Sequence, residues 1–216
     1  MSSQRRLLVV LLLAATAATC PMGPTVVLED LSVFGCVDLQ LAVATDNVTV
    51  VIDGATGTIN IISESSGTVL RLVGSIVTGD VVLGGPHAIV DLRGSTVTSA
   101  ANVVLCTDGR NIAVVVANST LTGAVVASIV VVGSDAVGAS ITVTESRLTT
   151  TPYAASVVVG TNATNVAIAV SRSVLALIGG VSDNAGVVAL TATFVVNAVV
   201  NVTESSIRAV FGGNMA

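Results

Sequence analysis

The sequence predicts an all-β protein that folds as a right-handed parallel β-helix of about seven rungs. The first observation is an internal repeat, centred on a small residue that is usually serine. The centres are Ala55, Ser75, Ser95, Ser119, Ser146, Ser173 and Ser205, separated by 20, 20, 24, 27, 27 and 32 residues. The second observation is that aliphatic residues lie five and three positions before every centre, and two positions after all but the first. Repeats of this length indicate a solenoid, a propeller or a similar array.

Each repeat is expected to contain two or three short strands joined by a corner. Aliphatic residues two positions apart are typical of a strand with one buried face. The alternation changes phase just before the centre, which indicates that the chain turns there. The corner is occupied in the first four repeats by Gly54, Gly74, Gly94 and Asn118, and both residue types tolerate a positive φ. A second aliphatic run follows in most repeats, as in Val81-Val82-Leu83.

One repeat per coil accounts for these patterns, because equivalent residues of successive coils would then stack as aliphatic ladders. A single coil is not stable alone, since ordering each residue's backbone costs about 1–2 kcal/mol. Each buried aliphatic side chain returns only about 1.5–3 kcal/mol. The repeats are too short for propeller blades, lack the frame of leucine-rich repeats, and are too regular for a β-sandwich. The right hand follows from the general preference of crossovers between parallel strands.

The chain divides into three expected segments, which are a signal peptide at 1–19, an N-terminal cap at 20–46 and the solenoid repeats at 47–216. The signal peptide is indicated by Arg5 and Arg6, followed by the apolar run Leu7–Ala15 and by small residues suited to cleavage. One alternative is an uncleaved anchor, although the run is shorter than the roughly 20 residues of a membrane span. Another is a lipoprotein acylated at Cys20.

The C-terminal end of the solenoid is expected to be open. The last repeat is followed by Gly212-Gly213-Asn214-Met215-Ala216, which offers no apolar segment to cover it. An uncovered strand edge is a template for pairing with another chain. The sequence therefore predicts that this chain is the N-terminal piece, or a truncated copy, of a longer solenoid. It also predicts end-to-end self-association as a possible consequence of the open edge.

Sequons and cysteines favour an extracellular or cell-surface location reached through the secretory pathway. The candidate N-glycosylation sites are Asn47, Asn118, Asn162 and Asn201. Asn201 is the weakest of them, because Val202 should point inward. In an oxidising compartment Cys20 and Cys36 are expected to form a disulfide that closes the cap. Cys106 would then remain as a small buried residue or pair outside this chain.

The charge of the chain excludes several partners. There is no lysine, and the formal net charge is −5. Without residues 1–19 the chain keeps six arginines against 13 acids, for a net charge near −7. Nucleic acids and anionic membrane surfaces select basic patches, so neither is an expected partner.

No catalytic, metal-binding or cofactor-binding residues are expected. The acidic residues are scattered in turn-like contexts, whereas glycoside hydrolysis needs two facing carboxylates. Asp91 and Arg93 are interpreted as a surface pair, and His87 lies in a turn without a recognisable triad. Glu145, Arg172 and Glu204 occupy the corner in the last three repeats and would alternate in sign along one exposed ladder. That ladder is also interpreted as surface pairing.

Several motifs resemble the dispersed gene family of surface proteins of trypanosomatid parasites. They are the arginine leader, the Cys20-Pro21 junction, Val-Val-Ile-Asp-Gly at 50–54, Asn-Ser-Thr-Leu-Thr at 118–122 and Thr-Glu-Ser-Arg-Leu at 144–148. The resemblance covers essentially the whole chain, which would match only an N-terminal portion of such a protein. It implies long, glycosylated, adhesin-like molecules with pectin lyase-like β-helix repeats, attached to the membrane through a C-terminal region missing here.

We therefore expect a secreted or cell-surface β-helix ectodomain with a structural or adhesive role and no catalysis. Its expected partners are host-cell or matrix glycans and proteins. The alternative is a carbohydrate-active β-helix enzyme, either a polysaccharide lyase or a hydrolase. Calcium-dependent cleavage of a polysaccharide would favour that alternative, and saturable binding without turnover would favour the ectodomain.

Overall fold

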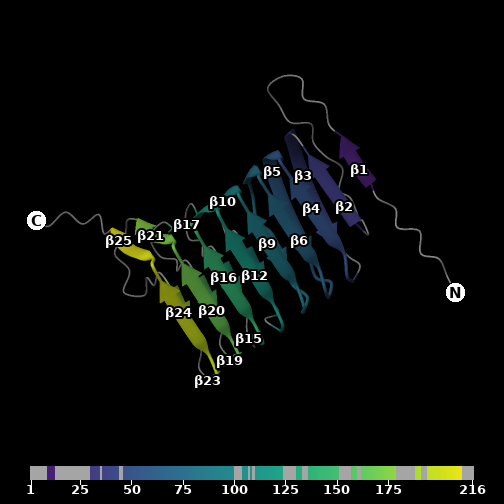
Figure 1. Ribbon diagram of the computed structural model, residues 1–216. Helices are drawn as coiled ribbons and strands as arrows, with labels where there is room; N and C mark the ends of the chain where they lie inside the picture. Colours follow the sequence, from purple (N-terminus) through teal and green to yellow (C-terminus); the bar gives the residue numbers. More distant parts are fainter. Residues whose placement is uncertain are drawn as a thin grey trace, which may run out of the picture.

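The computed structural model describes residues 9–12, 30–34, 36–43, 46–99, 104–106, 108, 110–123, 130–132, 136–150, 157–159, 162–178, 188–190 and 194–210. Every regular element within these ranges is a β-strand, and every strand pair is parallel. The strands stack one behind another along a single direction (Figure 1). The protein is therefore an all-β parallel solenoid.

Three sheets form the walls of the solenoid in the described part of the chain. The first runs in the order β1 (Val9–Leu12), β2 (Asp30–Phe34), β4 (Thr49–Asp53), β6 (Val69–Val73), β9 (Ile89–Arg93), β12 (Ala113–Ala117), β16 (Ser140–Thr144), β20 (Ala167–Ser171) and β24 (Val199–Thr203). The third is small and comprises β15 (Ala136–Val137), β19 (Asn162–Thr164) and β23 (Phe194–Val196).

The second sheet has two wings that meet at β5 (Thr56–Ser63), which also pairs with β3 (Cys36–Val43). One wing follows the serine centres and contains β7 (Ile76–Thr78), β10 (Thr96–Ser99), β13 (Thr120–Gly123), β17 (Arg147–Thr150), β21 (Val174–Ile178) and β25 (Ser206–Val210). The other follows the second aliphatic runs and contains β8 (Val81–Leu83), β11 (Val104–Cys106), β14 (Val130–Val132), β18 (Val157–Val159) and β22 (Val188–Leu190).

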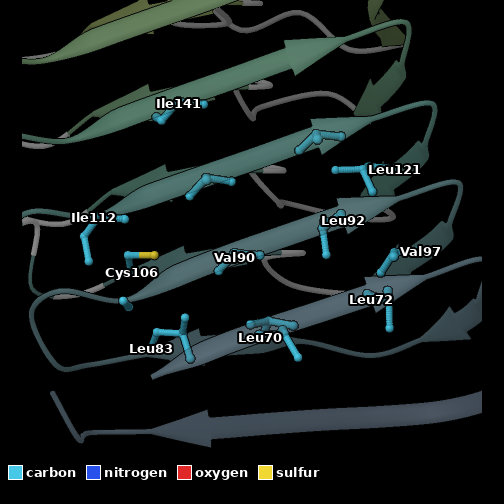
Figure 2. Close-up of a cluster of buried hydrophobic side chains, with 14 of the residues drawn as sticks. Leu70, Leu72, Leu83, Val90, Leu92, Val97, Cys106, Ile112, Leu121 and Ile141 are labelled. Carbon is cyan, nitrogen blue, oxygen red and sulfur yellow. The ribbon is translucent and has the colours of Figure 1, made fainter. Parts of the chain in front are cut away.

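The register confirms the predicted aliphatic ladders. Residues five positions before successive centres pair with one another along the first sheet, as in Leu70 with Val90 and Val90 with Val114. Residues three positions before the centres do the same, and so do those two positions after them in the second sheet. These side chains point into the space between the sheets and form one apolar core (Figure 2). The repeat pattern therefore correctly predicts the buried side chains of the first six repeats, whereas Val200, Val202 and Ile207 of the last repeat are exposed.

The corner before each serine centre is also confirmed. The backbone has a positive φ of 46–58° at Gly54, Gly74, Gly94, Asn118, Glu145, Arg172 and Glu204. Each amide from Gly54 to Arg172 donates to a carbonyl of the following coil, as Gly94 does to Ala117 at 3.0 Å. The left-handed conformation holds even where the residue is charged, because the neighbouring coils determine the path of the backbone at this corner.

The expected signal peptide and cap contain strands that continue the solenoid. Strand β1 lies within residues 1–19 and pairs with β2. Strands β2 and β3 lie within residues 20–46 and pair in register with β4 and β5. Leu41 and Val43 of β3 are buried. The removal of residues 1–19, and a capping role for residues 20–46, stay predictions.

Candidate functional site

The serine centres form a continuous hydrogen-bonded ladder. Each serine hydroxyl from Ser75 to Ser205 accepts a hydrogen bond from the amide of the preceding centre at 3.1–3.2 Å. It donates to the carbonyl two residues before it in its own coil, at 2.7–3.0 Å. The centre lies at a corner where the sheet ladder is interrupted, so its amide needs an acceptor from a side chain. Serine supplies that acceptor one coil later.

The exception at Ala55 has a geometric cause. Val33 pairs with Ile52, and Cys36 pairs with Thr56. Two residues lie between Val33 and Cys36, whereas three residues lie between their partners Ile52 and Thr56. The preceding corner is therefore one residue shorter than the corner that contains Ala55. Alanine fills the buried position without leaving a hydroxyl to satisfy.

The ladder geometry gives these serines a structural role. Ser75, Ser95, Ser119, Ser146 and Ser173 are all buried, and their hydroxyls are engaged by backbone groups. His87 lies on the exposed side of another turn, where its amide donates to the Arg110 carbonyl at 2.9 Å. A nucleophilic serine needs a general base within hydrogen-bond reach, and these serines are held by backbone groups instead.

Some of the charged residues of the described chain form surface ion pairs. Arg93 Nε lies 2.7 Å from Asp91 Oδ1, and Arg172 Nη2 lies 2.8 Å from Glu145 Oε1. The predicted pairing of Asp91 with Arg93 is confirmed, and so is that of Glu145 with Arg172, whereas the pairing of Glu204 in the same ladder stays a prediction. The arginine side chains are more than half exposed, so each pair contributes at most about 1 kcal/mol.

A third pair was missed at the sequence level. Arg110 Nη2 lies 2.5 Å from Asp108 Oδ2, and the Arg110 hydrogen bond lowers the pKa of the Asp108 carboxyl. The positive field of His87 lowers it further, whereas partial desolvation raises it. The only sign of this pair in the sequence is that the aspartate lies two residues before the arginine. The same spacing occurs between Asp91 and Arg93, but it is common in turns.

A second left-handed corner precedes the strands of the first sheet. It is formed by Asn47, Gly67, His87, Asn111, Gly138, Asn165 and Asn197. The side chains also stack, since Asn197 Nδ2 donates to Asn165 Oδ1 at 3.2 Å. Where glycine replaces asparagine the neighbour fills the space, because a Cβ at Gly67 would overlap Asn47 Oδ1. This corner therefore selects asparagine and glycine for reasons of conformation and packing.

The four sequon asparagines lie at exposed positions. Asn47 and Asn118 occupy left-handed corners, with φ of 59° and 49°. Asn162 begins β19, and Asn201 lies in the middle of β24 on the face opposite the core. Val202, which was expected to weaken the last sequon by pointing inward, belongs to the core-facing ladder but is itself partly exposed. Their modification stays a prediction.

Two of the three cysteines, Cys36 and Cys106, lie in described strands. Cys20 lies outside the described residues, and Cys36 is described only as the first residue of β3, so their disulfide stays a prediction. Cys106 is a buried free thiol, as one of the two sequence-based alternatives expected. Burial raises the pKa of the Cys106 thiol to about 12, which makes it an inert part of the core.

A hollow lies on the described surface beside β3 and β5. The hollow has a volume of about 510 Å³ and is lined by Ala42, Val43, Asp46, Ile62, Glu64 and Ser65. The Asp46 carboxylate already accepts the Ser66 amide at 2.8 Å. No three histidine, cysteine or acidic side chains within the described ranges are placed to hold a metal ion. The same ranges contain no helix with the length and apolar character of a membrane span.

No protein-family model, curated protein or solved structure matches this chain. The function is therefore inferred from the surface that the solenoid presents.

Proposed function

We propose that this protein is a secreted or cell-surface β-helix ectodomain with an adhesive or structural role and without catalysis. The observation that carries the proposal is a regular array of threonines on the outer face of the second sheet. This threonine face consists of Thr56, Thr58, Thr78, Thr96, Thr98, Thr120, Thr122 and Thr149. It alternates with the buried residues of the same strands.

The threonine face is periodic in two directions. Thr58, Thr78, Thr98, Thr122 and Thr149 pair in register from strand to strand. Strand spacing separates such neighbours by about 4.8 Å, and two residues along a strand span about 6.6 Å. The side chains are partly or fully exposed, and Thr78 Oγ1 lies 3.3 Å from Thr58 Oγ1. Rigid strands thus display hydroxyl and methyl groups at fixed intervals.

Such a surface fits a repeating partner, for which we propose extracellular glycans or matrix proteins of a host cell. Each contact would be weak, because a single exposed hydroxyl contributes little net free energy. Several contacts made at once by one rigid array raise the effective affinity through multivalency. Arg147, which pairs with Thr120, is the one charged side chain of β5, β7, β10, β13 and β17 on this face, so the face is mostly neutral and suits a hydroxyl-bearing partner. Secretion, use of the four sequons, and the resemblance to the trypanosomatid surface proteins all belong to this proposal.

We also infer that the seven repeats form seven successive coils with a right hand, as in pectin lyase-like folds. The inference is supported by the order in which β4, β6, β9, β12, β16, β20 and β24 pair, since it follows the order of the chain. The hand follows from the strong preference for right-handed connections between parallel strands.

A binding and turnover assay tests the adhesive role. The protein, secreted from a eukaryotic host, is applied to immobilised matrix glycans and proteins, with bound protein and newly released sugar ends both measured. We expect saturable binding without product, and at least about tenfold weaker binding after the double change Thr98→Lys and Thr122→Lys. Ser140→Lys, on the exposed outer face of the first sheet, is the matched control and is expected to bind normally. Calcium-dependent release of product, or equal binding by all three proteins, would refute the proposal.

A further inference from the structure

The middle of the threonine face presents hydroxyl groups that the protein itself leaves unused. It consists of Thr96 and Thr98 of β10 and of Thr120 and Thr122 of β13. Thr96 is exposed and the other three side chains are half-buried. Within the described part of the chain, no side-chain hydrogen bond engages these hydroxyls. Each of them therefore keeps its donor and its acceptor sites for a partner outside the chain.

These threonines occupy the corners of a rectangle. Thr96 pairs with Thr120, and Thr98 pairs with Thr122, across two neighbouring strands. Neighbouring strands lie about 4.8 Å apart, and two residues along a strand span about 6.6 Å. Thr78 continues one row of the array into the preceding coil, since it pairs with Thr98. The hydroxyl and methyl groups thus repeat along two directions of one surface.

The backbone beneath this array is held in place by the core and by the neighbouring strands. Val97 and Leu121, which lie between the threonines, are only 3% and 0% exposed and belong to the buried core (Figure 2). Both β10 and β13 pair with a strand on each side. Threonine is branched at Cβ, which restricts its χ1 angle. The array is therefore ordered before a partner arrives, which reduces the entropy lost on binding.

A partner that engages the whole array must be neutral, rigid and periodic in two directions. Strands β7, β10 and β13 contain no charged residue, and Arg147 lies at the margin of the array, at the start of β17. Charge complementarity therefore favours an uncharged partner over an ionic one. A glycan chain repeats along one direction only. The surface of an ice crystal is neutral and rigid, and its oxygen atoms recur at intervals close to both spacings of the array.

We propose that the threonine face binds the surface of ice. The threonine hydroxyls hydrogen-bond with water molecules of the surface layer, and the methyl groups pack between those molecules. Each contact is weak, but contacts made together at matched spacings reinforce one another. Bound protein blocks the growth of ice where it lies, so the freezing temperature falls while the melting temperature stays. This inference uses the same face as the proposed adhesive role but does not depend on the glycan or matrix partner of that role.

Thermal hysteresis, the gap between the melting and freezing temperatures of a single ice crystal, tests the inference on the secreted protein. We expect a gap that widens with protein concentration, and protein carried into slowly growing ice. Thr98→Tyr and Thr122→Tyr each keep a hydroxyl and suit a strand, but the added ring breaks the flat array. Each is expected to narrow the gap at least about tenfold. Ser140→Tyr, on the exposed outer face of the first sheet, is the matched control and is expected to keep the full gap.

Binding to matrix glycans and proteins, measured on the same variants, separates this inference from the adhesive role. Exclusion of the unaltered protein from ice, with no gap, would overturn the inference whether or not glycans bind. So would a gap that survives both tyrosine changes in variants with unaltered circular dichroism, or an equal loss in Ser140→Tyr. A gap that the two threonine changes abolish, without binding to glycans or matrix proteins, would support ice as the partner and refute the adhesive role.

Discussion

Replacing Ser119 by alanine removes one rung of the serine ladder from the middle of the solenoid. The Ser119 hydroxyl accepts the Ser95 amide at 3.2 Å and donates to the Ala117 carbonyl at 2.8 Å. Its loss leaves the Ser95 amide without an acceptor in a buried corner. The Ala117 carbonyl keeps a partner, because it also accepts the Gly94 amide at 3.0 Å. One unpaired buried donor costs about 1–3 kcal/mol, so the free energy of unfolding is expected to fall by that amount.

Two matched variants separate this effect from a general intolerance of substitution. Ser205→Ala removes the same hydroxyl from a hydrogen bond to the Ser173 amide that is only partly buried, so it is expected to cost less than about 1 kcal/mol. Ala55→Ser adds a hydroxyl where the preceding corner is one residue shorter, so it is expected to give no stabilisation. Urea titrations followed by circular dichroism compare the midpoints at constant m-value. Equal midpoints for Ser119→Ala and the unaltered protein, or equal losses at Ser119 and Ser205, would refute this reasoning.

Three further predictions concern the corners, the buried thiol and the sequons. Gly54→Ala is expected to lower the unfolding free energy by about 1 kcal/mol through its positive φ alone. Gly67→Ala is expected to lower it more, because the added Cβ would also meet Asn47. Equal losses of unfolding free energy in the two variants would contradict this. Above pH 9.0 the unfolded chain loses the Cys106 proton while the folded chain keeps it, since folding raises this pKa to about 12. The unfolding free energy relative to Cys106→Val is therefore expected to fall by about 1.4 kcal/mol per pH unit above pH 9, and parallel pH curves would exclude it. Each asparagine-to-glutamine change at a sequon is expected to lower the intact mass of secreted protein by one glycan, and an unchanged mass would show an unused site.

The buried ladders were predictable from the sequence because a solenoid repeats the same environment in every coil. Positions such as Leu72, Leu92 and Val116 face the same interior and are filled by the same class of residue. Burying an aliphatic side chain contributes enough free energy that buried positions can be recognised in a single sequence. The repeat therefore indicated the fold class, the core positions and the corner before each centre.

Features that depend on the neighbouring coil were not predictable in the same way. Glu145, Arg172 and Glu204 adopt a left-handed backbone that their residue types do not indicate, because the hydrogen bonds of adjacent coils impose it. The role of the serines was equally hidden, since it depends on an amide that belongs to the coil before. The threonine face was also missed, because exposed threonines show their order only when the strands are paired in register.

The serine ladder gives the solenoid a direction of assembly. Every acceptor hydroxyl comes from the later coil, so the amide of each serine centre stays unpaired until the next coil has formed. A chain emerging from the ribosome begins with its N-terminal coils, and each one is completed by the segment synthesised next. Shortening the chain after any serine centre would leave the amide of that centre without its hydroxyl acceptor, whereas starting the chain later would leave every remaining serine-centre amide paired. Each serine centre thus depends for its amide acceptor on the coil that follows it and not on the coil that precedes it.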